Sequence, residues 1–151
     1  MKSRIFNILA IVGMAASLPG IAIYAQQEPS EGSHQLSVWD GVYTEEQALR
    51  GEAFYGQHCA SCHGGSLEGA DAATPLVGPA FTANWDTITL GDLFDRIRIT
   101  MPLDRPGSVS RQENLQILTY ILKSNKFPSG ETELPRQRMW LRQMLFLESK
   151  P

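Results

Sequence analysis

Cys59-Ala60-Ser61-Cys62-His63 is the stretch on which the interpretation of this chain depends. It holds the two cysteines of the 151-residue sequence, which are separated by two residues, and a histidine directly follows the second cysteine. Two cysteines are too few for a disulfide framework, and a disulfide across two residues would be strained. A zinc site would need two further ligands, for which His34 and His58 are poorly placed. A thioredoxin-like redox pair would need a preceding strand and a βαβ pattern, which this sequence does not indicate.

Covalent haem attachment is the chemistry that a C-x-x-C-H sequence favours. Two thiols add across the vinyl groups on one edge of haem, and the two-residue gap lets a helical turn present both thiols to that edge. The adjacent histidine then lies beneath the iron and donates an imidazole nitrogen to it. We therefore predict one haem c, attached through Cys59 and Cys62, with His63 as an iron ligand.

The first 25 residues are predicted to be an export signal. Lys2 and Arg4 precede an apolar stretch over residues 5–18, and Ala25 provides a small residue at the expected cleavage point. The alternative is an uncleaved membrane anchor, since the stretch approaches spanning length if Pro19 is included. In either case the rest of the chain is expected to be periplasmic or otherwise exported, and an uncleaved segment would associate it with a membrane.

The remaining sequence divides into three parts. Residues 26–37 are rich in Gln, Glu, Ser and Gly and are expected to form a flexible linker. Residues 38–129 are predicted to be the folded domain, and residues 130–151 a C-terminal extension. In that extension Trp140, Leu141, Met144 and Leu145 could share one helical face, as a strap packed on the domain or as a helix that binds a partner.

Three helices are expected in the domain, which is therefore predicted to be all-α with long loops. Capping-box patterns start the first and third helices, at Thr44-Glu45-Glu46-Gln47 and at Ser110-Arg111-Gln112-Glu113, and Thr89 can start the second. Residues 64–84 are predicted to be loop because they are dense in Gly, Ala, Pro and Thr. Such a domain buries little apolar surface by itself, so a haem at its centre would also supply stability.

Met101 is the predicted second iron ligand. It lies between two expected helices, and Pro102 favours an extended backbone at this residue. Thioether ligation opposite histidine favours ferrous iron and raises the redox potential. The alternatives are core packing of Met101 and ligation by a methionine of the extension, Met139 or Met144.

The stretch from Trp39 to Pro128 resembles the small monohaem c-type cytochromes, the soluble class with His/Met iron. The resemblance implies that the helix before C-x-x-C-H crosses the last helix, through Gly51 and Tyr55 on the first and Leu118, Tyr120 and Ile121 on the last. It also implies that the Pro79 carbonyl accepts a hydrogen bond from the second nitrogen of His63. Trp85 resembles a family aromatic residue that contacts a haem propionate, with core packing as an equal alternative.

The function predicted from these features is single-electron transfer between exported redox proteins, without catalysis of a substrate reaction. An exported dehydrogenase is the expected donor, and an oxidase or another cytochrome the expected acceptor. The alternatives are a cytochrome subunit or dedicated acceptor of an exported quinoprotein-type dehydrogenase and, with an open iron position, a haem peroxidase or gas sensor. The net charge of −3 and the lack of any run of Lys or Arg argue against a nucleic-acid partner and against a lysine-rich docking face.

Overall fold

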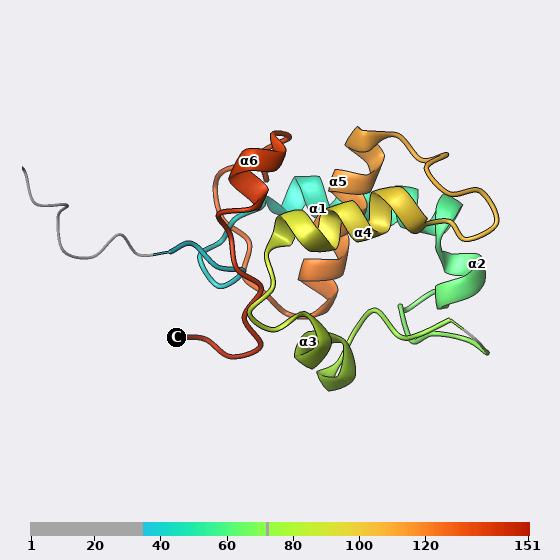
Figure 1. The fold of residues 1–151 in the computed structure, drawn as a ribbon, viewed down its shortest axis with the longest axis horizontal. Helices are drawn as coiled ribbons and strands as arrows, with labels where there is room; N and C mark the ends of the chain where they lie inside the picture. The colour runs from blue at the N-terminus through green and yellow to red at the C-terminus, as the bar shows by residue number, and fades with distance from the viewer. Residues whose placement is uncertain (1–34, 72) are drawn as a thin grey trace, which may run out of the picture. The chain divides into compact units, whose positions relative to one another are not determined.

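The computed structural model describes residues 35–71 and 73–151, so the predicted signal segment and most of the predicted linker lie outside the described residues. Within those ranges the fold consists of six helices (Figure 1). They are α1 (Glu45–His58), α2 (Ala60–His63), α3 (Pro79–Trp85), α4 (Leu90–Thr100), α5 (Arg111–Ser124) and α6 (Arg138–Leu141). The β-structure among the described residues is limited to isolated bridges, so the predicted all-α fold is confirmed. No helix in this part of the chain is long and apolar enough to cross a membrane.

Helix starts follow the capping residues read from the sequence. The Thr44 hydroxyl accepts a hydrogen bond from the Gln47 backbone N–H, and Thr89 caps α4 in the same way. Ser110 and Glu113 form the complete reciprocal capping box at the start of α5. The prediction of loop throughout residues 64–84 is wrong at α3. Pro79 fits the first turn of that helix because its missing N–H would have no intrahelical partner there.

The crossing of α1 and α5 forms the centre of the domain (Figure 1). Gly51 and Tyr55 lie buried on α1, and the Tyr55 ring packs against Tyr120 with ring centroids 5.3 Å apart. A Cβ atom added at Gly51 would lie 1.8 Å from the Gln116 carbonyl oxygen of α5. The two backbones therefore approach more closely than any side chain at this position allows, and the crossing expected from the family resemblance is confirmed.

The C-terminal residues are part of the same core. Leu145 N–H donates to the Leu36 carbonyl at 2.8 Å, and Val38 N–H donates to the Leu145 carbonyl at 2.9 Å. The chain before Val38 is thus already hydrogen-bonded at Leu36 and buried at Ser37, within the stretch that the sequence suggests is linker. Gln47 does not complete a capping box at α1; its side chain instead exchanges two hydrogen bonds with the Leu134 backbone. Residues 134–148 run as a strap over the helices.

A row of aromatic rings fixes this strap. Phe146 is fully buried, with ring centroids 5.0 Å from Phe127 and 6.0 Å from Phe81. Trp39 packs edge-on against Phe127 and donates its indole N–H to the Leu147 carbonyl. The strap thereby links the start of the folded part to α3.

Charged contacts fix the other end of the strap. The Asp95 side chain on α4 is only 11% exposed, and the Arg138 Nε donates to its carboxylate at 2.6 Å. Arg142 reaches the same carboxylate at 3.6 Å and Asp92 at 3.1 Å. The cost of burying the Asp95 charge is offset by these guanidinium groups. Of the two interpretations of the extension, these contacts support the strap.

Gly51→Ala is expected to lower the free energy of unfolding by about 1–3 kcal/mol or more, because the new methyl group collides with the backbone of α5. Gly56→Ala on the same helix meets nothing within 4 Å and is the matched control. It should raise the stability by about 0.5–1 kcal/mol through helix propensity. Denaturant unfolding of the two variants measures both effects. Equal stability changes would contradict a close α1–α5 contact.

Phe146→Ala is expected to destabilise the domain by about 3–5 kcal/mol, because it removes a fully buried ring from the aromatic row. Met139→Ala, at a side chain that is 64% exposed, should change the stability by less than about 0.5 kcal/mol. Thermal and denaturant unfolding provide the comparison. A small effect at Phe146 would mean that the strap is not needed for the fold.

Candidate functional site

The cysteine motif lies on a single helical turn directly after α1. Cys59 ends α1, and the N–H groups of both Cys62 and His63 donate to the Cys59 carbonyl, at 3.1 and 3.0 Å. This winding points the two sulfurs and the imidazole toward one cavity. The spacing of the motif therefore produces the local arrangement that the sequence suggests.

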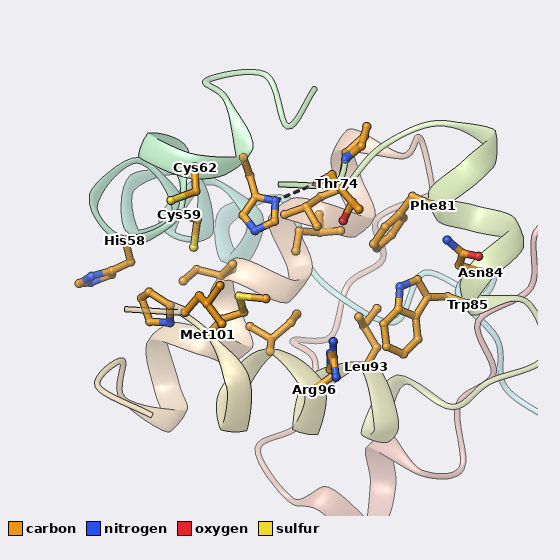
Figure 2. Close-up of a pocket in the computed structure, with 18 of the residues that line it drawn as sticks. His58, Cys59, Cys62, Thr74, Phe81, Asn84, Trp85, Leu93, Arg96 and Met101 are labelled. Carbon is orange, nitrogen blue, oxygen red and sulfur yellow. Dashed lines mark hydrogen bonds between the residues drawn. The ribbon is translucent and has the colours of Figure 1, made fainter. Parts of the chain in front are cut away.

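The cavity has a volume of about 630 Å³, within the range of about 300–1,000 Å³ typical of cofactor sites. Figure 2 shows Cys59 and Cys62 at one end and Asn84 and Trp85 at the other. Most of the wall is apolar and comes from every described helix except α6. Its aliphatic and aromatic members are Leu76, Ala80, Phe81, Trp85, Leu93, Ile97, Leu103, Ile117 and Ile121.

His63 is held in one tautomer. Its Nδ1 lies 2.9 Å from the carbonyl oxygen of Thr74, as the dashed line in Figure 2 shows. Because a carbonyl can only accept, Nδ1 carries a proton, and in the neutral imidazole Nε2 then keeps its lone pair. The imidazole is therefore prepared to donate Nε2 to a metal, with its ring orientation fixed by the hydrogen bond at the opposite nitrogen.

The carbonyl that holds His63 differs from the one expected. The family resemblance implied Pro79, but Pro79 begins α3 and its carbonyl accepts from the Thr82 hydroxyl. Thr74 lies in the loop before α3, closer along the chain to the motif, and reaches the ring instead. The physical reason is that α3 commits the carbonyl of its first residue to its own helix.

Two side chains outside the cavity support the loop that carries Thr74. Asn125, at the end of α5, donates to the Leu76 carbonyl at 2.9 Å and accepts from the Gly78 N–H at 3.1 Å. On the other side of the motif, the Tyr55 hydroxyl donates to the Gly64 carbonyl at 2.6 Å. The loop is thus tied to both crossing helices. Asn125 belongs to no recognisable motif, so the sequence identifies it only as a residue at the end of a helix.

Neither cysteine forms a disulfide. Burial raises the pKa of the Cys59 thiol to about 11, and the neighbouring Cys62 adds to the shift. Cys59 is therefore a neutral thiol at physiological pH, whereas a redox-active C-x-x-C pair has a thiol whose pKa is lowered. The described residues also contain no group of three or more His, Cys, Asp or Glu that could hold a metal ion. Both observations argue against the zinc and thioredoxin alternatives.

Met101 enters the cavity from the end of α4. It is the C-cap residue, with an extended backbone at φ −116° and ψ 153°, and its N–H donates to the Ile97 carbonyl. Figure 2 shows its side chain in the cavity below the two cysteines. Met144 is buried in the strap and Met139 is exposed on α6, and neither lines the cavity. The cavity thus brings together Cys59, Cys62, His63 and Met101.

Trp85 also lines the cavity, and its ring packs against Phe81 with centroids 6.4 Å apart. The position is compatible with both roles considered for it, contact with a bound group and packing. Arg96 and Asn84 also line the cavity and were not identified from the sequence, where an arginine on a helix and an asparagine in an apparent loop carry no distinguishing pattern.

The residues of the cavity fit a covalently attached haem. Two free thiols lie on one turn beside a histidine whose Nδ1 donates to a carbonyl, and a thioether enters the same space. The apolar walls suit a porphyrin face, and the volume suits a cofactor of that class. When bound, haem supplies an iron that exchanges single electrons.

Comparison with known proteins agrees with this chemistry. Residues 46–121 match the family described as cytochrome c oxidase, cbb3-type, subunit III. This span covers half of the chain and extends from the first turn of α1 almost to the end of α5. The chain belongs to this family. It is a small c-type cytochrome, a haem c electron-transfer protein.

Two further comparisons add little to the description of this cytochrome. No curated protein matches the chain. The solved structure of the sulfane dehydrogenase SoxCD from Paracoccus pantotrophus is similar with a TM-score of 0.49 and 20% sequence identity, over 81% of this chain and 68% of that chain. At this score and identity we infer nothing about function or partners from that structure.

Replacement of both Cys59 and Cys62 by alanine is expected to abolish covalent haem in the cytochrome, because both free thiols of the motif are removed. Each single variant should retain haem through one thioether at reduced yield. Haem staining of the protein after denaturing electrophoresis measures the bond. The Ser61→Ala variant, which changes a residue between the cysteines, should stain like wild type. Haem staining of the double variant would disprove the assigned attachment.

Proposed function

We propose that this cytochrome carries one haem c in an exported compartment and moves single electrons between redox proteins. The observation that carries the proposal is the convergence of Cys59, Cys62, His63 and Met101 on one cavity. The signal-like sequence of residues 1–25 supports export. If that segment is retained, it also provides membrane association.

The protein's role in electron transfer is to keep the cofactor and its ligands in a fixed geometry when the oxidation state changes. The thiols of Cys59 and Cys62 would hold the haem covalently, and His63 and Met101 are proposed as the ligands that would bind its iron. The Thr74 carbonyl fixes the His63 ring, so the imidazole keeps its orientation while the oxidation state changes. The apolar walls exclude water and, with the thioether ligand, favour a high redox potential.

With His63 and Met101 both on the iron, no iron position would be left for a substrate. We therefore propose that the cytochrome is not itself an enzyme, in contrast to the peroxidase and gas-sensor alternatives. An exported dehydrogenase is the proposed donor, and an oxidase or another cytochrome the proposed acceptor. The domain lacks a lysine-rich face, so a purely electrostatic docking mode is disfavoured.

Met101→Ala is expected to lower the midpoint potential and to remove the far-red sulfur-to-iron absorption band of the ferric protein. It should also let carbon monoxide bind the ferrous protein, because an axial position becomes free. The measurements are optical spectra and a redox titration of the exported holoprotein. Met139→Ala is the matched control, since Met139 is exposed on the strap outside the cavity.

Met139→Ala should leave the band and the potential unchanged. Covalent haem with no such band in the wild type, together with ready carbon monoxide binding, would overturn the carrier proposal. It would favour an open iron position, and with it a sensor or a peroxidase.

A further inference from the structure

The outer side of α6 combines two exposed apolar side chains with exposed arginines. Met139 is 64% exposed and Trp140 is 49% exposed. Arg136, Arg138 and Arg142 are also exposed and flank them along the chain. Within the described part of the chain, no side-chain hydrogen bond or ring contact engages the Trp140 indole. The packing of the strap on the domain therefore accounts for the inner side of α6 and leaves these groups uncovered.

The charge around α6 is positive. Residues 134–147 contain three arginines and no Asp or Glu. Among the described residues, no carboxylate pairs with the Arg136 side chain. Arg111, at the start of α5, donates to the Arg136 carbonyl at 2.8 Å and lies over the Phe94 ring. It brings a further cation to the same side of the domain.

The aspartates of α4 neutralise only part of this charge. Arg138 and Arg142 both pair with Asp95, and Arg142 also reaches Asp92. Arg98 approaches Asp95 as well, at 3.8 Å. Two carboxylates therefore face three arginines, and positive charge remains in excess at the surface.

The chain enters the fold beside this surface. Trp140 and Leu36 line one hollow of about 350 Å³, together with Val42 and Met144. Any residues that precede the described part of the chain join it next to Leu36, at Gln35. The exposed apolar side chains and the N-terminal connection are therefore on the same side of the domain.

Two carboxylates also line this hollow. Glu133 is paired with Arg50, so its charge is compensated. Asp40 accepts hydrogen bonds from the Ser37 N–H and hydroxyl and keeps its charge. Asp40 thus subtracts one charge from a side of the domain that carries several arginines, and the balance stays positive.

These side chains are of the kind that favours a lipid surface. The tryptophan ring prefers the boundary between headgroups and acyl chains, and arginine binds anionic phosphate groups. If residues 5–18 are retained as an anchor, residues 19–34 join that anchor to the fold, and a chain of this length spans at most about 55 Å. The domain would then meet the bilayer at high effective concentration.

We propose that the α6 surface, defined as Arg136, Arg138, Met139, Trp140 and Arg142, binds the surface of an anionic phospholipid bilayer. An acidic protein would match the arginines but would not explain why the N-terminal connection lies beside them. Figure 1 shows α6 at the opposite end of the fold from α2, so bilayer contact at α6 keeps the cysteine motif away from the lipid. The proposal goes beyond the proposed function and does not depend on the iron ligands.

The test measures the accessibility of Met139 in the full-length holoprotein. A methionine-selective oxidant is added in the presence of vesicles of phosphatidylcholine, with or without phosphatidylglycerol, and oxidation is followed by peptide mass spectrometry. Trypsin cleaves after Arg138 and Arg142, so Met139 and the buried Met144 lie in different peptides. Met144 is therefore the internal reference. Bilayer contact at α6 slows oxidation at Met139 and leaves the rate at Met144 unchanged.

Anionic vesicles are expected to slow the oxidation of Met139 severalfold, and neutral vesicles much less. Arg136→Glu should abolish this protection because it reverses a charge of the α6 surface without removing an ion pair inside the domain. Lys126→Glu makes the same change in net charge at an exposed position after α5 and should keep the protection. Equal rates in anionic and neutral vesicles, or equal effects of the two substitutions, would overturn the proposal.

The apolar contribution is tested by Trp140→Ser, which should weaken the protection. Leu49→Ser is its matched control, since Leu49 is 51% exposed on α1. Protection that appears without vesicles and grows with protein concentration would assign the surface to a second copy of the chain instead. Equal protection by soluble polyglutamate would assign it to acidic proteins. Either result would contradict bilayer binding.

Failure of the proposed function gives a different result. The wild type would then lack covalent haem or the far-red band, whereas the protection of Met139 by anionic vesicles would remain. Conversely, loss of bilayer binding in Arg136→Glu should leave the haem spectrum as in wild type, because Arg136 does not line the cavity.

Discussion

The close contact between α1 and α5 at Gly51 is the constraint on which the rest of the site depends. α1 runs directly into the cysteine motif, so its crossing angle with α5 fixes where Cys59, Cys62 and His63 lie. α5 supplies Ile117 and Ile121 to the cavity wall and ends at Asn125, which supports the loop beside His63. A change of even a methyl group at the contact would move both walls of the cavity together.

The strap also positions cavity wall residues, on the side of the cavity that faces the cysteines. Phe146 packs on Phe81, and Phe81 is itself a cavity wall residue beside Trp85. At its other end Arg138 and Arg142 hold α4 through Asp95, one residue before Arg96. The strap thus braces α3 and α4, the two helices that face the cysteines across the cavity. Leu141, Met144 and Phe146 of the strap are buried in this packing.

The sequence predicted features that depend on local chemistry. Thr44, Thr89 and Ser110 cap helices because the short hydroxyl side chain accepts a hydrogen bond from the free backbone N–H three residues later. The prediction from the sequence failed where the contact that decides a residue's role is distant along the chain. Gln47 has the right position for a capping box but bonds the Leu134 backbone, 87 residues away. The partner of His63 and the role of Asn125 depend on loop geometry that no periodicity encodes.

The cavity is assembled from segments that are far apart in sequence, and this matters for electron transfer. His63 is oriented by a carbonyl from the loop before α3, whereas Met101 is placed by the end of α4. Each proposed ligand is therefore fixed by a separate element, and those elements are joined through the crossing helices and the strap. Movement of one ligand would require repacking of a shared core, which resists continuous deformation. A site held in this way changes its charge with little change of shape, as single-electron transfer requires.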